Sequence, residues 1–247
     1  MKNSFGTEGS QSSGGGDADR NREHPLIVSE FSRADVEPDG KLDKSFWAGV
    51  ERVRFDHAAF SRASYPEAET TVASRWTRKF LYLAFRCRYQ TLNIYQGEDP
   101  GPERWQLWEK DVAEAFINPN PDHPFHYYEF EIAPNNQWLD LEINLARNPM
   151  SDAHWNSGFE HRTHIDPARH LWTVEMRIPV AAMTHTPIEP GSEWRVNFYR
   201  CDGPGSGNAR RLMSWGAMPK ESTEHTFHQP ASFGRLRFAA SGAKMAP

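Results

Sequence analysis

The chain has 247 residues, enough for one large all-β domain or two smaller domains. Its formal charge is -5 and it has no run of Lys and Arg, which argues against a nucleic-acid partner. No apolar run reaches the roughly 18 residues needed to cross a bilayer, so no membrane-spanning helix is predicted. Aromatic residues make up 13% of the chain, which favours strands that bury aromatic side chains between them.

The two ends differ in composition from the rest of the chain. Residues 1–24 are rich in Gly, Ser and charge and are predicted to form a disordered leader. They lack the apolar segment of a signal peptide, which predicts a cytoplasmic location, or a secreted or periplasmic one if a signal has been removed. Residues 239–247 are predicted to be a loose tail, so the folded domain covers residues 25–238.

Short apolar or alternating segments, separated by turn residues, follow one another along this domain. Residues 80–87 are apolar at both sets of alternating positions, which is typical of a strand buried on both faces. About ten to twelve such strands, with few short helices and no strand–helix alternation, predict an all-β, two-sheet antiparallel sandwich of the jelly-roll kind. The other predicted strands cover residues 26–31, 53–55, 70–76, 111–117, 125–133, 138–145, 160–165, 170–178, 193–201, 209–215 and 233–238.

The two cysteines and the histidines give no signal for a disulfide or for a metal site. Cys87 and Cys201 each lie in a predicted strand, and we interpret both as small buried apolar side chains rather than as a disulfide. The 11 His residues are scattered without metal-ligand spacing, so no metal site can be placed.

Residues 106–117 hold the strongest binding signal, because an aromatic residue on a loop precedes a strand with a carboxylate. One face of a sugar ring carries C–H bonds that pack on an aromatic ring. Its hydroxyl groups need polar partners, since an unpaired buried hydroxyl costs a few kcal/mol. Trp108 is therefore predicted to be an exposed sugar platform, with Trp105 as a weaker candidate.

Glu114 is flanked by apolar residues on its predicted strand face, so its carboxylate needs a partner. A ligand role and an internal ion pair with Arg86 or Arg200 would each provide one. Glu129 and Glu131 also share a strand face, which we interpret as a solvated charged face rather than as a ligand rim.

Five motifs, in this order and spacing, resemble the carbohydrate-binding module family 9 domains of the wider DOMON-like sandwich group. Together they extend over nearly the whole predicted domain, from about Val28 to Phe238. The motifs are residues 39–43 with Trp47, residues 80–85, residues 107–117, residues 128–134, and a C-terminal set of residues 196–200, 213–215 and 227–238.

The resemblance implies a β-sandwich that binds the terminal sugar of a glycan between two aromatic rings. It maps the first ring onto Trp108, the acidic partner onto Glu114, and the second ring onto Phe227, where characterised modules have Trp. A family Arg falls near Glu131 and a family Gln near Tyr199, so the polar residues differ from the sugar-binding pattern. The family also implies that a structural calcium ion could bind, but no dense Asp/Asn loop is present and no cofactor is predicted. The predicted saccharide site comprises Trp108, Glu114, Glu131, Tyr199, Arg200 and Phe227.

Two other functions compete with sugar binding. A stand-alone enzyme acting on a saccharide would draw on Glu114, Glu131, Tyr128 or His126 as acid and base. Some DOMON-like sandwiches bind haem, and Met150, Met213 or a His could then serve as axial ligands.

Overall fold

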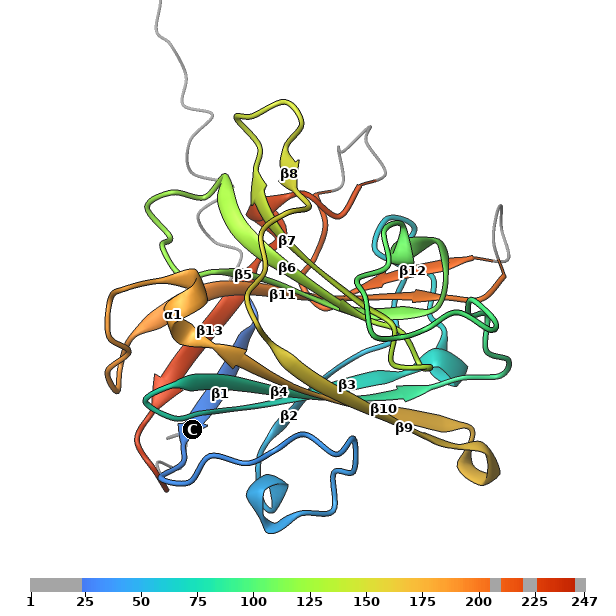
Figure 1. Ribbon diagram of the computed structural model, residues 1–247, viewed down its shortest axis with the longest axis horizontal. Coiled ribbons are helices and arrows are strands. Elements are labelled where there is room, and N and C mark those ends of the chain that lie inside the picture. Colours follow the sequence, from blue (N-terminus) through green and yellow to red (C-terminus); the bar gives the residue numbers. More distant parts are fainter. Residues whose placement is uncertain (1–23, 205–209, 220–225, 243–247) are drawn as a thin grey trace, which may run out of the picture.

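The computed structural model describes residues 24–204, 210–219 and 226–242. Residues 1–23 of the predicted leader and 243–247 of the predicted tail lie outside the described residues. Within these ranges, thirteen strands form one continuous sheet that curls over into two layers (Figure 1). The all-β prediction is therefore confirmed, and the two layers are those of a sandwich.

Strands distant in sequence make up each layer. In the upper layer of Figure 1 they are β5 (Val112–Asn118), β6 (His126–Ile132), β7 (Trp138–Asn144), β8 (Ser151–Asp152), β11 (Glu193–Asp202) and β12 (Arg211–Ser214). In the lower layer they are β2 (Arg52–Phe55), β3 (Thr70–Trp76), β4 (Phe80–Arg88), β9 (Glu160–Asp166) and β10 (Leu171–Pro179).

Two strands from opposite ends of the described chain join the layers. They are β1 (Leu26–Phe31) and β13 (Gly234–Ala239), and they pair in parallel. β1 also runs parallel to β3, while β13 is antiparallel to β11. The sheet is therefore not antiparallel throughout, and hydrogen bonds continue from one layer into the other.

Helical segments are short. The longest described is α1 (Val180–Met183), one turn after β10. The others are the 3-10 turns η1 (Ser45–Trp47), η2 (Pro66–Ala68), η3 (Leu107–Glu109), η4 (Pro167–Arg169) and η6 (Pro230–Ser232). In the part of the chain that the structure describes, no helix is long and apolar enough to cross a bilayer.

The main core lies between the layers, because alternate side chains of each strand point into it. In β4, Leu81, Leu83 and Phe85 face this core, whereas Tyr82 and Ala84 pack beneath the N-terminal loop. The prediction that this strand is buried on both faces is confirmed.

Glu175 of β10 fastens the N-terminal loop to the lower layer. Its carboxylate accepts hydrogen bonds from the backbone N–H groups of Asp39 (2.8 Å) and Gly40 (2.9 Å), from Lys44 Nζ (2.8 Å) and from Trp47 Nε1 (2.6 Å). Gly40 has a positive φ of 77°, and a Cβ there would lie 2.6 Å from the Thr163 backbone carbon. These contacts explain why the Asp-Gly turn and the Trp form one motif.

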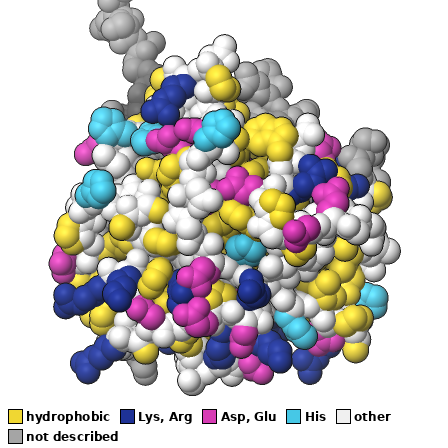
Figure 2. Space-filling model, viewed as in Figure 1, with side chains coloured by type: hydrophobic (Ala, Val, Ile, Leu, Met, Phe, Trp, Pro, Cys, Tyr) yellow, Lys and Arg dark blue, Asp and Glu magenta, His cyan; other side chains and the backbone are white. Residues whose placement is uncertain are grey.

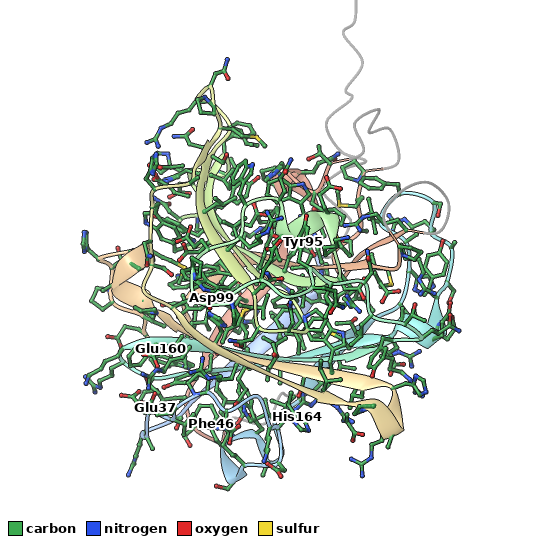
Figure 3. The ribbon with its side chains drawn as sticks, turned by 45° about the vertical axis from the view of Figure 1, so that its right-hand side comes forward. Glu37, Phe46, Tyr95, Asp99, Glu160 and His164 are labelled. Carbon is green, nitrogen blue, oxygen red and sulfur yellow. The ribbon has the colours of Figure 1, made fainter. Side chains whose placement is uncertain are left out.

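Ion pairs reinforce the edge of this layer. Arg177 pairs with Glu37 at 2.5 Å and also with Glu160. Figure 3 shows Glu37 and Phe46 of the N-terminal loop on the same side of the molecule as Glu160 and His164 of β9. On the face seen in Figure 2, most Lys and Arg side chains gather over the lower layer, with Asp and Glu between them.

The cysteines are buried in different apolar clusters. Cys87 lies in the core between the layers, and Cys201 lies on the other face of the upper layer. Both are free thiols, so the interpretation as small buried side chains is confirmed.

Candidate functional site

The site lies on the outer face of the upper layer, which we define as the face pointing away from the lower layer. Strand register decides which side chains it receives, because alternate residues point to opposite faces. Glu114 pairs with Glu131 across β5 and β6, and Phe116 pairs with Glu129. The outer face carries Val112, Glu114 and Phe116 of β5, Tyr127, Glu129 and Glu131 of β6, and Tyr199 and Cys201 of β11.

Loops cover this face and leave a pocket of about 440 Å³. Residues 89–106 form the longest of them, and Figure 3 shows its Tyr95 and Asp99. Tyr95 packs against the outer-face cluster, and the Arg104 guanidinium lies 3.9 Å from the centre of its ring. The pocket lining includes Trp105, Trp108, Glu114, Glu129, Arg210 and Phe227.

Trp108 stands at the pocket wall because of the turn that carries it. Gln106 has a left-handed backbone with a φ of 63°, and the buried Leu107 anchors the 3-10 turn η3. The next side chain, Trp108, is half-buried and lines the pocket. Trp105, 45% exposed, meets it edge to face with ring centres 5.0 Å apart.

Phe227 lines the same pocket and rests on Tyr199. The two rings stack with centres 4.2 Å apart, and the Tyr199 hydroxyl donates to the Phe227 carbonyl oxygen at 3.0 Å. Tyr199 is fully buried and does not line the pocket. It supports an aromatic wall instead of contributing to the predicted polar rim.

Three carboxyl groups lie side by side beneath these rings. Glu114, Glu129 and Glu131 are 1%, 4% and 0% exposed. The interpretation of Glu129 and Glu131 as a solvated face is therefore wrong, because the loops cover the outer face. Glu114 and Glu129 line the pocket, whereas Glu131 lies beside them, away from its surface.

Burial changes the proton affinity of this group of acids. Burial, followed by the nearby Glu129 carboxylate, raises the pKa of Glu114 to about 8. The Cys201 thiol, which donates to Glu114 at 3.2 Å, and the charge of Arg210 oppose this rise in pKa. Burial and the charges of Glu114 and Glu129 also raise the pKa of Glu131 well above its ordinary value.

Arg200 points in the opposite direction, into the core between the layers. Its guanidinium lies 4.8 Å from the Trp172 ring centre and donates to Asp202 at 2.8 Å. Arg200 and Tyr199 are consecutive residues of β11 and must face opposite sides. The predicted rim therefore loses Arg200, and no ion pair between Glu114 and Arg200 or Arg86 forms among the described residues.

The pocket also contains residues that sequence reasoning did not assign to it. Phe116 and Glu129 could have been found, because each lies two residues from a predicted site residue on the same strand. Arg210 and His228 come from loops, where no periodic signal exists. His228 Nδ1 lies 2.8 Å from the Tyr127 hydroxyl, and Arg210 donates to the Glu109 carbonyl at 2.9 Å.

Of the residues suggested for an enzyme, Glu114 and Glu131 are neighbours across β5 and β6, but His126 and Tyr128 do not join them. His126 and Tyr128 lie on the face of β6 opposite Glu131, where His126 pairs with Glu142 at 2.6 Å and Tyr128 stacks on Trp155. Met213 is buried between the layers, whereas Met150 lies at the pocket rim. Within the described ranges, no group of three or more His, Cys, Asp and Glu is arranged to hold a metal ion.

Comparison with known families identifies the family to which the chain belongs. The model of the family described as carbohydrate family 9 binding domain-like matches residues 38–240. The chain therefore belongs to this family. A protein of Arthroderma benhamiae, described as an extracellular protein, is 26% identical over 204 residues, which cover 78% of this chain and 86% of that protein.

Solved structures show the same fold. A candidate carbohydrate-binding protein of Bacteroides uniformis has a TM-score of 0.69 at 19% identity, covering 87% of this chain and all of the other. A family 9 carbohydrate-binding module of Caldicellulosiruptor kristjanssonii, in complex with cellotriose, has a TM-score of 0.61 at 16% identity and covers 90% of this chain and all of its own. Its complex with glucose gives the same score at 17% identity and the same coverage.

Proposed function

We propose that this protein binds carbohydrate and holds a terminal sugar in the pocket on the outer face of the upper layer. The observation that carries the proposal is the pairing of two aromatic walls, Trp108 and Phe227, with a floor of buried carboxyl groups. The rings offer surface to the C–H face of a sugar, and the carboxyl oxygens accept hydrogen bonds from its hydroxyl groups.

The family and the pocket volume support the same proposal. About 440 Å³ falls within the range of small-ligand pockets and leaves room for one or two sugar rings. The fully buried Tyr199 and the rings around Phe116 stiffen the floor, so little conformational freedom is lost when a ligand binds. Glucose and cello-oligosaccharides are the first ligands to test, because the solved structures of a related module are complexes with glucose and with cellotriose.

Calorimetric titration with glucose, cellobiose and cellotriose tests the proposal. Trp108→Ala and Phe227→Ala should each weaken binding about tenfold, because each removes one stacking surface. Phe125→Ala is the matched control, since Phe125 is 59% exposed and does not line this pocket. The Phe125→Ala variant should bind the sugars with the same affinity as the unaltered protein.

Two outcomes would contradict the proposal. One is the absence of heat with every mono- and oligosaccharide tried. The other is equal affinity in the Trp108→Ala, Phe227→Ala and Phe125→Ala variants, which would place the sugar elsewhere.

A further inference from the structure

The pocket floor holds three buried carboxyl groups, Glu114, Glu129 and Glu131, and none of them forms an ion pair with a cation among the described residues. Glu129 lines the pocket, is 4% exposed, and its Oε2 atom has no hydrogen-bond donor among the described residues. Glu114 lies beside it in the same lining, and Glu131 lies next to both with neither oxygen reached by a donor in the described part of the chain. Buried carboxylates without a donor are costly, so this arrangement is suited to a ligand that brings donors with it.

Arg210 does not neutralise this floor. Its guanidinium lines the pocket but donates to the backbone carbonyls of Glu109 (2.9 Å) and Lys110 (3.4 Å). Among the described residues it forms no ion pair with Glu114 or Glu129. Its charge lowers the pKa of Glu114, but burial and Glu129 outweigh it.

We propose that the pocket prefers a saccharide whose terminal residue carries a free ammonium group, an amino sugar, with the ammonium seated on Glu129 and Glu114. This rests on the proposed sugar-binding function and names its ligand class. An ammonium group brings three donors and one positive charge, whereas the hydroxyl group at the same ring position brings one donor and no charge.

The pocket walls favour the same ligand. The faces of Trp108 and Phe227 attract cations through their ring quadrupoles, and this attraction grows in a partly desolvated pocket. A metal ion does not fit the arrangement, because no three metal-binding side chains of the described residues converge on one point. The pocket is wider than a single ammonium chain requires, which favours a ring-shaped ligand.

Binding should also release protons. At neutral pH much of Glu114 holds its proton, because its pKa is raised to about 8. An ammonium group nearby favours the ionised carboxylate and lowers that pKa. The proton leaves to the buffer, and the heat of binding then depends on the ionisation enthalpy of the buffer.

Calorimetry of the full chain with a matched pair of ligands tests the inference. The β-1,4-linked glucosamine disaccharide and cellobiose share ring and linkage and differ at the C2 substituent. At about pH 6, where a primary amine is protonated, the glucosamine disaccharide should bind at least about tenfold more tightly. Titrations of the unaltered protein in buffers of different ionisation enthalpy should show proton release with this ligand.

Variants test whether the preference for the amino sugar comes from the carboxyl groups of the pocket floor. Glu129→Gln keeps the shape and removes the charge, so the ratio of the two affinities should fall toward one. Glu51→Gln removes the same charge from the exposed loop after Trp47 and should leave the ratio intact. Thermal denaturation checks that both variants are folded, and the buffer series tests the inference without any variant.

The outcomes separate this inference from the proposed function. Equal affinity for the two disaccharides would overturn the ammonium preference and leave sugar binding standing. Failure of both to bind, together with all neutral sugars, would remove both proposals. Lysine methyl ester binding as tightly as the glucosamine disaccharide would overturn the assignment to a saccharide.

Discussion

Glu131 is a carboxyl group buried beside two others, and no described donor reaches its oxygens. Burial and the neighbouring charges raise the pKa of Glu131 and Glu114 above the value in the unfolded chain. The folded protein therefore holds protons that the unfolded chain releases. The stability gained in this way is complete below about pH 4.5, the ordinary pKa, and is lost as the pH rises through about 8, where Glu114 ionises.

Replacing Glu131 by Met should stabilise the protein, because it removes a buried carboxyl while keeping a linear side chain. We expect the free energy of unfolding to rise by about 1–3 kcal/mol at about pH 8 and by less at about pH 5. Urea denaturation at both pH values measures this. Glu51→Met, at an exposed carboxylate, is the control and should show no such pH dependence. An equal rise in the free energy of unfolding at the two pH values would show that ionisation of the buried carboxyl group is not the cause.

The N-terminal loop depends on a single residue of β10. Glu175, 2% exposed, accepts four hydrogen bonds from residues 39–47, including one from the charged Lys44. With Trp47 and Val50, the loop covers the face of β3 and β4 that points away from the core between the layers. It lies on the layer that does not carry the pocket, so its loss should affect stability rather than binding.

Glu175→Gln should lower the free energy of unfolding by about 2–3 kcal/mol, because it breaks a partly buried charge pair and leaves donors unpaired. Urea denaturation measures the loss, and hydrogen exchange should show faster exchange at the Asp39 and Gly40 amides. Glu37→Gln is the control, since Glu37 also pairs with a β10 residue, Arg177, but its side chain is 77% exposed. A comparable loss in the control would show that the four bonds are not the cause.

At the scale of the whole molecule, the sheet is continuous through β13 and β1, so hydrogen bonds link the two layers at one edge. The core between the layers contains side chains of both. These two features predict that the layers unfold together rather than one after the other.

The two cysteines report on this directly, because Cys87 belongs to the lower layer and Cys201 to the upper. In the Cys201→Ala and Cys87→Ala variants, the remaining thiol should react with a thiol reagent at a rate set by global unfolding. The two rates should agree once corrected for each variant's stability. Cys201 also lines the pocket, so the reagent must be too bulky to enter it, and much faster reaction at Cys201 with such a reagent would show that the upper layer opens independently.

The sequence by itself determined the strands, because alternation and turn residues are local properties. The β4 segment, the meander of β5 to β7 and the partial exposure of Trp108 just before β5 could all be predicted in this way. The family resemblance added the order of the motifs and brought Phe227 and Glu114 into one hypothesis. The parallel junction of β1 and β13 had no local signal, since it joins the two ends of the described chain.

Only the tertiary structure decided which polar residues face the pocket. Strand alternation already puts Arg200 and Tyr199 on opposite faces, but only the packing of the two layers decides that Arg200 enters the core and that Tyr199 lies beneath Phe227. Glu129 resembled a solvated residue because nothing near it in sequence predicts the loops that cover it. Burial depends on packing between distant segments, and burial is what turns an ordinary acidic strand into the floor of a binding pocket.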